Sequence, residues 1–173
     1  MIPISPLFGS PGATAPGRVH DLARFDDVPL GWSPLQELAV EAARVAEVPM
    51  SAINVMTASV QRTVAAVGAE PTLRARVDSM CHRILGEGRT VHVEDASRDA
   101  RLATNPFVDG RWGTIRFYGA HPLITSDGSA VGTLCVLDSR PRVLEPAEVA
   151  RLDALAARAV DVLEGWHQTS WVA

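Results

Sequence analysis

The chain has 173 residues, 47% of them hydrophobic, and a formal net charge of −4 at pH 7. This length favours one well-packed domain over two. All 16 basic residues are arginines, and the absence of lysine excludes a Walker-type phosphate loop, pyridoxal attachment and Schiff-base chemistry. The arginines are scattered, so the sequence offers no concentrated basic surface for a nucleic-acid partner.

The sequence carries no signal for export or membrane insertion. The N-terminal run M-I-P-I-S-P lacks a charged segment followed by an apolar one, and no apolar run approaches the roughly 20 residues that span a bilayer. The two cysteines, Cys81 and Cys135, fall inside apolar segments, which suits a reducing compartment better than a disulfide scaffold. We therefore expect a cytoplasmic protein without a membrane partner.

The first part of the chain divides into an arm and a helix. Residues 1–20 contain seven prolines and glycines, which is typical of a flexible arm. A helix is expected from Ser33, with Ser33 as N-cap, Pro34 at the first helical position and Gln36 completing a capping box. Apolar residues then recur at helical spacing until Pro49 ends the helix.

Two strands are expected next, at residues 50–57 and 60–67, joined by a short turn. Asn54 shares one face of the first strand with Ala52 and Met56, because side chains alternate along a strand. If that face is buried, the side-chain amide of Asn54 needs hydrogen-bond partners inside the protein.

The middle of the chain predicts a second helix over residues 72–85. Its apolar stripe comprises Leu73, Val77, Met80 and Ile84, with Cys81 beside it. A short strand at 90–94 follows, and then a short polar helix that begins at Asp99 and must finish before Pro106.

A long hairpin and a final helix complete the expected elements. Strands at 115–125 and 130–138 are joined by the tight turn S-D-G-S. The last helix spans 146–164, with Gly165 as the residue that ends it. The hairpins and the two terminal helices, each with one apolar stripe, predict an α+β domain with a mainly antiparallel sheet and helices on at least one face.

In their order and spacing, several motifs resemble those of the GAF domain, a sensor fold related in architecture to PAS domains. They are P-M-S-A-I-N-V-M at the first strand, the cysteine-bearing helix, V-E-D-A-S-R-D-A-R-L-A-T-N-P, I-R-F-Y-G-A-H-P-L and D-G-S-A-V-G-T-L-C-V-L-D. Together they are typical of a GAF subgroup of bacterial signalling proteins, and the likeness covers about residues 22–164. It implies a GAF/PAS-like α+β fold with a roughly six-stranded antiparallel sheet, flanking helices and a pocket roofed by the short helix and loops.

The resemblance divides the chain into an arm at 1–20, a GAF domain at 21–165 and a tail at 166–173, whose Trp166 and Trp171 either fold back or cover a partner. It also implies a homodimer formed through the terminal helices. GAF domains usually sit beside an output module, and this chain ends soon after its last helix. We therefore expect the output to be a separate protein.

The resemblance further implies a site for a small molecule, although the sequence identifies neither the ligand nor any cofactor. The candidate pocket residues are Asn54, Asp95, Arg101, Asn105, Trp112, Tyr118, His121 and Cys135. His121 departs from the subgroup, which usually has small residues in this bend. Structural roles compete with binding, since Asp99 is well placed to cap the short helix and Asp95 can pair with Arg98 or Arg101.

Catalysis has little support in the sequence. There is no G-x-S-x-G, phosphate-loop or H-E-x-x-H motif, and no metal site is expected because His82, His92 and His121 lack ligand spacing. Cys81 and Cys135 could form a redox pair, as in a methionine-sulfoxide-reducing branch of the GAF family. The cysteine motifs of that branch are missing, and the apolar neighbours favour buried structural thiols.

Three functions remain as hypotheses. The one we favour is a non-catalytic sensor module that binds a small ligand and passes its occupancy to a partner protein. The second is a structural or dimerisation module whose pocket is filled by side chains. The third is a thiol enzyme of the methionine-sulfoxide-reductase kind, which would require reactive cysteines.

Overall fold

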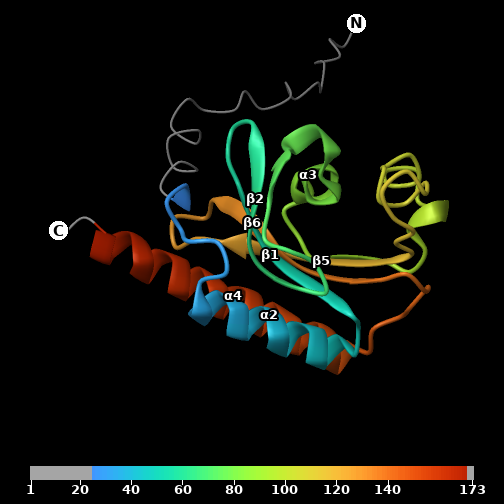
Figure 1. The fold of residues 1–173 in the computed structure, drawn as a ribbon. Helices are drawn as coiled ribbons and strands as arrows, with labels where there is room; N and C mark the ends of the chain where they lie inside the picture. Colours follow the sequence, from blue (N-terminus) through green and yellow to red (C-terminus); the bar gives the residue numbers. More distant parts are fainter. Residues whose placement is uncertain (1–24, 171–173) are drawn as a thin grey trace, which may run out of the picture.

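The computed structural model describes residues 25–170, with side chains as far as Trp166. Its centre is a sheet of six antiparallel strands in the order β3-β2-β1-β6-β5-β4 (Figure 1). The strands are β1 (Met50–Met56), β2 (Val60–Val67), β3 (Leu73–Ala75), β4 (Val91–Val93), β5 (Phe117–Ile124) and β6 (Ala130–Asp138). This arrangement confirms the α+β fold expected from the sequence.

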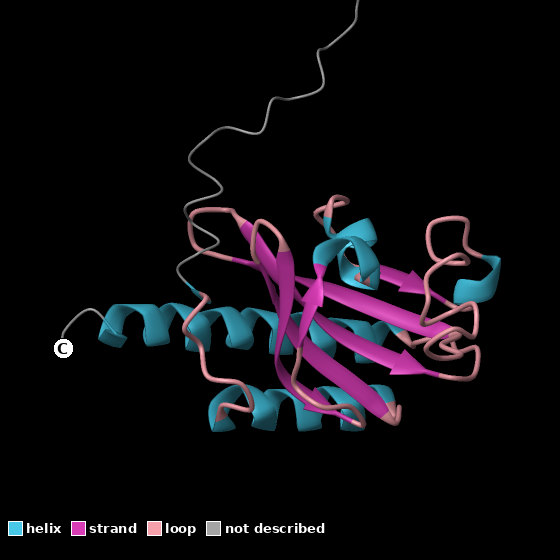
Figure 2. Ribbon diagram, turned by 45° about the horizontal axis from the view of Figure 1, so that its top comes forward, coloured by secondary structure: helices cyan, strands magenta, loops and turns pink. Residues whose placement is uncertain are grey.

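Helices cover the two faces of the sheet differently. α2 (Ser33–Ala46) and α4 (Pro146–Ser170) lie side by side across one face, whereas α3 (Met80–Leu85) and the loop-rich segment 94–116 lie on the other (Figures 1 and 2). In the described part of the chain, no helix combines the length and the apolar character needed to cross a membrane.

Two apolar cores result from this layering. The larger lies between the sheet and the helices α2 and α4, and it contains Ile53, Phe117 and Leu152. The smaller lies between the sheet and α3, and it contains Ile84 and Tyr118. Phe117 and Tyr118 enter different cores because neighbours along a strand point to opposite faces.

The first helix forms where it is predicted, but its cap differs. The N-cap is Trp32, which makes no side-chain cap hydrogen bond, and Ser33 is already helical. Gln36 does not complete a capping box, because its amide bonds across to β2. Its Nε2 donates to the Ala66 carbonyl at 2.7 Å, and its Oε1 accepts from the Ala66 amide at 3.1 Å. A tertiary partner thus outcompetes the local motif.

The helix predicted over 72–85 is wrong in its first half. Strand β3 and a 3-10 turn replace that half, and α3 begins only at Met80. Leu73 and Val77 are 56% and 71% exposed, so the apolar stripe does not reach a core. β3 forms because its backbone pairs with the edge of β2, a partner that helical periodicity cannot reveal.

The short helix expected from Asp99 lies earlier in the chain. A 3-10 turn spans Ala96–Arg98 and is capped by Asp95, whose carboxylate accepts from the Ser97 amide at 3.1 Å. Asp99 accepts from the backbone and side chain of Arg101 instead. Two aspartates four positions apart both suit a cap, and spacing alone could not choose between them.

α4 is longer than predicted. It continues through Gly165 into the tail, so this glycine does not end the helix. The ring of Trp166 lies 5.0 Å from that of Trp32, which shows that this tail residue folds back on the domain and supports the extra turn. The predicted arm at 1–20 and Trp171 lie outside the described residues.

Candidate functional site

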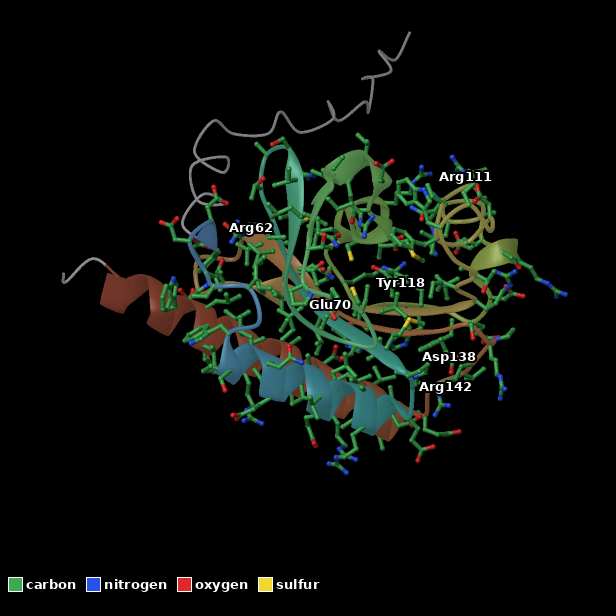
Figure 3. All side chains as sticks on the ribbon, viewed as in Figure 1. Arg62, Glu70, Arg111, Tyr118, Asp138 and Arg142 are labelled. Atoms are coloured by element: carbon green, nitrogen blue, oxygen red, sulfur yellow. The ribbon has the colours of Figure 1, made fainter. Side chains whose placement is uncertain are left out.

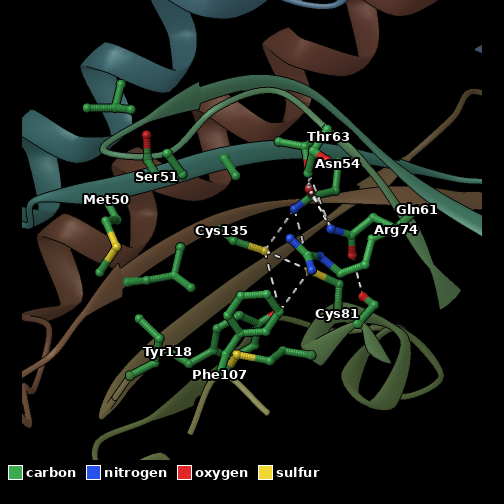
Figure 4. Close-up of a pocket in the computed structure, with 18 of the residues that line it drawn as sticks. Met50, Ser51, Asn54, Gln61, Thr63, Arg74, Cys81, Phe107, Tyr118 and Cys135 are labelled. Atoms are coloured by element: carbon green, nitrogen blue, oxygen red, sulfur yellow. Dashed lines mark hydrogen bonds between the residues drawn. The ribbon is translucent and has the colours of Figure 1, made fainter. Parts of the chain in front are cut away.

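A pocket of about 160 Å³ lies between the sheet and α3 (Figure 4). Figure 3 places one of its lining residues, Tyr118, inside the molecule on the α3 side of the sheet. The apolar walls are formed by Met50, Val67, Met80, Phe107, Ile115 and Leu137. A mostly apolar pocket with a few placed polar groups is typical of small-molecule sites.

Strand register assembles the floor of this pocket. β1 pairs with β6 so that Asn54 lies opposite Thr133 and Ala52 lies opposite Cys135. Directly paired residues of antiparallel strands share a face, so these four side chains project to the side away from α2 and α4. Tyr118 joins them from β5, which is the other neighbour of β6.

The buried amide of Asn54 is the centre of a hydrogen-bond cluster. Asn54 is 2% exposed, and its Oδ1 accepts from Gln61 Nε2 at 2.9 Å and from Thr63 Oγ1 at 2.8 Å. Its Nδ2 donates to the sulfurs of Cys81 and Cys135, at 3.4 and 3.6 Å. The expectation that a buried Asn54 would have internal partners is confirmed.

Ser79 extends the cluster to α3. Its hydroxyl accepts from the His82 amide at 3.1 Å, which caps the helix, and donates to Gln61 Oε1. Successive donors therefore run from α3 through Ser79, Gln61 and Asn54 to the two sulfurs. Aligned hydrogen bonds polarise one another, so the cluster favours negative charge at the sulfur end.

The two thiols meet at the pocket floor although they are distant in sequence. Cys81 Sγ lies 3.3 Å from Cys135 Sγ. The Tyr118 hydroxyl donates to Cys81 Sγ at 3.1 Å, and Thr133 Oγ1 lies 3.1 Å from Cys135 Sγ. Both cysteines are free and buried, as the sequence predicts. Their proximity was not predicted.

The surroundings give the two thiols different acidities. The hydrogen bond with Cys135, followed by those with Thr133 and Tyr118, lowers the pKa of Cys81 to about 7 against the opposing effect of burial. Burial raises the pKa of Cys135 well above its ordinary value. Burial and the nearby sulfurs also raise the pKa of Tyr118, which stays a neutral donor. One negative charge on the pair therefore resides on Cys81.

Arg74 and Glu70 are the charged residues of the pocket lining. The Arg74 guanidinium lies 4.4 Å from the ring centroid of Phe107 and 5.7 Å from that of Trp112. Figure 4 shows Arg74 and Phe107 among the residues around the cavity. This cation–π contact joins β3 to the loop that precedes β5.

Three of the eight residues predicted for the site line the pocket, namely Asn54, Tyr118 and Cys135. The other five do not. Asp95 caps the 3-10 turn and lies 3.6 Å from Arg98 as an ion pair. Arg101 pairs with Asp99 at 2.6 Å and also with Glu87, and hydrogen bonding to Asp99 raises its pKa. These contacts hold the loop in place.

Asn105 and Trp112 also lie outside the pocket lining. The Asn105 Nδ2 donates to the Asp78 carbonyl at 3.0 Å, and its Oδ1 accepts from the Phe107 amide at 3.0 Å. The buried Asn105 therefore joins the loop to the residues before α3. Trp112 is 54% exposed and reaches the site through its ring contacts with Phe107 and Arg74.

His121 lies on the helix face of the sheet. Its Nδ1 is 2.6 Å from Asp153 Oδ1 in α4, and its Nε2 is 3.1 Å from His92 Nε2 in β4. Thr90 Oγ1 donates to the same carboxylate at 2.7 Å. Three positions separate His121 from Tyr118, so alternation places them on opposite faces. The described residues contain no group of three or more side chains suited to a metal ion.

Sequence reasoning missed Gln61, Thr63, Ser79 and Arg74 as pocket residues. Alternation could have placed Gln61 and Thr63 on one face of their strand, but only the register puts that face against Asn54. Ser79 precedes α3 as a serine N-cap, a signal that the over-long predicted helix concealed.

Comparison with known proteins agrees with this fold. The family model of the GAF domain matches residues 34–163. The match covers most of the chain, and the chain belongs to the GAF family, a family of signalling and sensor modules.

One curated relative and two solved structures illustrate the likeness. A cyclic di-GMP phosphodiesterase of Pseudomonas aeruginosa is 32% identical over 139 residues, which are 79% of this chain but only 23% of that relative. The GAF domain of an Acinetobacter phosphoenolpyruvate-protein phosphotransferase superposes with a TM-score of 0.65 at 15% identity, over 89% of this chain and 95% of that one. The blue-light-absorbing form of the PixJ GAF domain of Thermosynechococcus elongatus gives 0.64 at 15% identity, over 92% and 95%. The two structures show the shared fold.

Proposed function

We propose that this chain is a non-catalytic, cytoplasmic sensor module whose pocket binds a small molecule and whose occupancy is read by a separate output protein. The observation that carries the proposal is the pocket of about 160 Å³, with apolar walls and a floor of hydrogen-bonded polar groups. Membership of a family of signalling modules supports the same function.

The pocket suits a compact ligand with an apolar body. The amides of Asn54 and Gln61 already bond within the floor, so the ligand does not have to supply hydrogen-bond partners for them. Arg74 lines the same pocket, and its guanidinium is the group that a ligand carboxylate or phosphate would meet.

Occupancy can be transmitted because the pocket has one wall on the sheet and one on α3 and its neighbouring loop. α3 is a single short helix, joined to β2 by the hydrogen bond between Ser79 and Gln61. A ligand that binds one arrangement of α3 more tightly than another shifts the population toward it. The helices α2 and α4, on the opposite face, would present the change to a partner.

A pocket-filling substitution tests the proposal. Ala52 lines the pocket on β1, so Ala52→Phe puts a ring into the cavity. Ala157→Phe adds the same ring to the exposed surface of α4 and is the matched control. Native mass spectrometry detects a retained ligand, and a thermal-shift screen of metabolites detects a weaker one.

We expect a compound that stabilises the wild type and Ala157→Phe but leaves Ala52→Phe unchanged. The proposal is rejected if no compound binds the wild type in either experiment, or if the compound stabilises Ala52→Phe to the same degree.

A dimerisation module is the second candidate, favoured by the outer surface of the helices. The apolar stripes of the terminal helices pack on the chain's own sheet, so a dimer through these helices has to use their outward faces. There Val40 of α2 is 52% exposed, and the groove between α2 and α4 has lining residues of both charges, including Glu37, Glu41, Arg158 and Asp161. Mixed charge suits a symmetric contact between two copies.

Light scattering should show a dimer that Val40→Glu dissociates, and a monomer at every concentration would exclude this candidate.

The thiol-enzyme hypothesis draws its support from the 3.3 Å separation of Cys81 Sγ and Cys135 Sγ. A non-catalytic module predicts no turnover of free methionine sulfoxide in the presence of a thiol reductant. Sustained turnover that is lost in Cys81→Ser would show instead that the chain is an enzyme.

A further inference from the structure

Cys81 and Cys135 are placed for a reaction that ligand sensing does not use. They are 54 positions apart in sequence, on α3 and β6, yet their Sγ atoms lie 3.3 Å apart. A disulfide requires about 2.05 Å between the sulfurs, so a change of roughly 1.3 Å joins them.

The sulfur pair is surrounded by hydrogen-bond donors. Asn54 Nδ2 donates to both sulfurs, and the Tyr118 hydroxyl donates to Cys81 (Figure 4). Donors of this kind bind a thiolate more strongly than a neutral thiol. The hydrogen bonds with Cys135, Thr133 and Tyr118 lower the pKa of Cys81, whereas burial raises the pKa of Cys135. One sulfur is thereby prepared as a nucleophile, and the other keeps its proton.

The pocket gives small molecules access to both sulfurs. Cys81 and Cys135 line it, although the two residues are only 4% and 1% exposed. Hydrogen peroxide is little larger than water, which occupies about 30 Å³ in the liquid, and the cavity of about 160 Å³ accommodates it. A tripeptide disulfide such as oxidised glutathione is too large to bring its sulfur to the pocket floor.

We propose that Cys81 and Cys135 form a dithiol that hydrogen peroxide, entering through the pocket, oxidises to an intramolecular disulfide. The Cys81 thiolate attacks one peroxide oxygen, so that an S–O bond forms and the O–O bond breaks. The leaving hydroxide becomes water by taking from the solvent the proton that Cys81 released on ionising. The Cys135 sulfur then attacks the sulfenic sulfur of Cys81. The S–S bond forms, the S–O bond breaks, and the departing hydroxide takes the Cys135 proton. Two thiols lose two electrons, and one peroxide becomes two waters.

This inference rests on the pocket of the proposed function and gives it a second input. A disulfide ties α3 to β6 through the pocket floor, and it removes the thiolate that the amide of Asn54 and the hydroxyl of Tyr118 stabilise. The α3 wall then has less freedom to rearrange around a ligand. The oxidation state of the dithiol therefore sets how strongly the pocket responds to its ligand.

Mass measurement after thiol alkylation tests the reaction. The reduced full-length chain is treated with an equimolar amount of hydrogen peroxide, quenched with N-ethylmaleimide under denaturing conditions and weighed. We expect the wild type to lose both alkylatable thiols and two hydrogen atoms, and to yield a peptide cross-linked between Cys81 and Cys135. Cys135→Ser should stop at a sulfenic acid that dimedone traps, and Cys81→Ser should stay unreacted. Wild-type protein that keeps both thiols under excess peroxide overturns the proposal, as does Cys81→Ser reacting at the wild-type rate.

Two further variants test the roles of the donors and the pocket. Tyr118→Phe removes one donor and keeps the ring, so it should slow oxidation several-fold at neutral pH and move the pH profile of iodoacetamide alkylation of Cys81 to higher pH. An unchanged profile would show that Tyr118 does not position or activate the thiol. Ala52→Phe should slow oxidation by peroxide, whereas Ala157→Phe should not. Oxidised glutathione reacting as fast as peroxide would exclude access through the pocket.

The two proposals fail separately in these experiments. A screen in which no compound binds rejects the sensor proposal. The reaction with peroxide can still be measured in that case, because the number of free thiols is counted independently of any ligand. A protein that binds a ligand but keeps unreactive thiols rejects the dithiol alone.

Discussion

Asn54 illustrates at the residue scale how one buried side chain organises the chemistry around it. Its Oδ1 accepts from Gln61 and Thr63, while its Nδ2 faces the sulfurs of Cys81 and Cys135. An aspartate would lack the donor and would set a second negative charge against the Cys81 thiolate. A leucine would remove the acceptor that Gln61 Nε2 and Thr63 Oγ1 share. The position therefore requires a residue that both donates and accepts.

Replacing Asn54 by leucine should destabilise the fold. Gln61 Nε2 and Thr63 Oγ1 lose their shared acceptor, and a buried donor without a partner costs about 1–3 kcal/mol. We expect the free energy of unfolding in urea to fall by roughly 3 kcal/mol. The exposed control Ser139→Ala should stay within about 0.5 kcal/mol of the wild type. Equal stabilities for the two variants would show that the cluster does not stabilise the fold.

The contact between His92 and His121 predicts sensitivity to acid. Burial is the largest cause that lowers the pKa of each histidine below 6.5, although Asp153 opposes it. The carboxylate of Asp153 holds the proton on His121 Nδ1, so His121 Nε2 accepts from His92. The folded protein therefore binds protons less readily than the unfolded chain. Stability is unaffected above pH 6.5 and falls as the pH drops below it.

His121→Gln removes one of these titrating groups. Its free energy of unfolding should fall less steeply than that of the wild type between about pH 6.5 and about pH 5, by up to about 1.4 kcal/mol per pH unit for one proton. Urea titrations at several pH values measure the slope. The pKa of His82 is also lowered, by burial and by Arg76. Because both proteins contain His82, its contribution cancels in the difference between their slopes. Parallel slopes would contradict the prediction.

At the scale of elements, the pairing of β1 with β6 brings the site together. It sets Asn54 beside Thr133 and Ala52 beside Cys135. The two strands approach closely at Gly132, where a Cβ atom would collide with the backbone carbonyl of Asn54. The glycine is needed for this close approach because the neighbouring atom belongs to the backbone and cannot move aside.

Gly132→Ala should destabilise the protein by roughly 3 kcal/mol, since the strands must separate to admit the methyl group. Gly165→Ala is the matched control, because an added Cβ there meets no atom within 4 Å. In α4 this change should stabilise the fold by about 0.5–1 kcal/mol. Thermal unfolding of both variants measures the difference, and a neutral Gly132→Ala would show that the sheet is more compliant than the structure indicates.

At the scale of the whole molecule, the sheet separates the larger apolar core from the pocket. The larger core lies on the face covered by α2 and α4, and the pocket with the smaller core lies on the α3 face. Figure 2 shows the helices on these two faces of the sheet. Substitutions on the first face should therefore change stability and leave the pocket chemistry in place. Ala52 lines the pocket, so Ala52→Phe should instead change the binding of the ligand and the oxidation of the thiols.

Leu152→Ala tests this division. Leu152 is fully buried between α4 and the sheet, so the free energy of unfolding should fall by about 3 kcal/mol. Leu73→Ala makes the same change at a side chain that is 56% exposed on β3 and should cost well under 1 kcal/mol. Peroxide oxidation of folded Leu152→Ala should proceed at the wild-type rate. A large loss of reactivity would show that the packing of α4 also controls the reactivity of the thiols.

The local features of the sequence determined most of the secondary structure and the fold. Apolar runs bounded by turns marked the strands around Asn54 and Tyr118, and the D-G turn marked the β5–β6 hairpin. Together with the motif order, these features predicted the six-stranded antiparallel sheet. Sequence alternation also bore on the site, since it excludes His121 and Tyr118 from a shared face. The predictions were wrong where a partner elsewhere in the chain decided the local structure. Residues predicted as helix form β3 because they pair with β2, and the amide of Gln36 bonds to β2 and does not complete a capping box.

Only the tertiary structure decided which side chains meet. Sequence placed Cys81 on a helix and Cys135 on a strand and predicted buried thiols, but their contact depends on how α3 packs over β6. The same holds for Gln61, Thr63 and Asn54, whose cluster depends on the register of β1 and β2. Propensity and alternation act over a few residues. Register and packing are set by contacts among all the elements at once, and a one-residue slip would turn every one of these side chains to the other face.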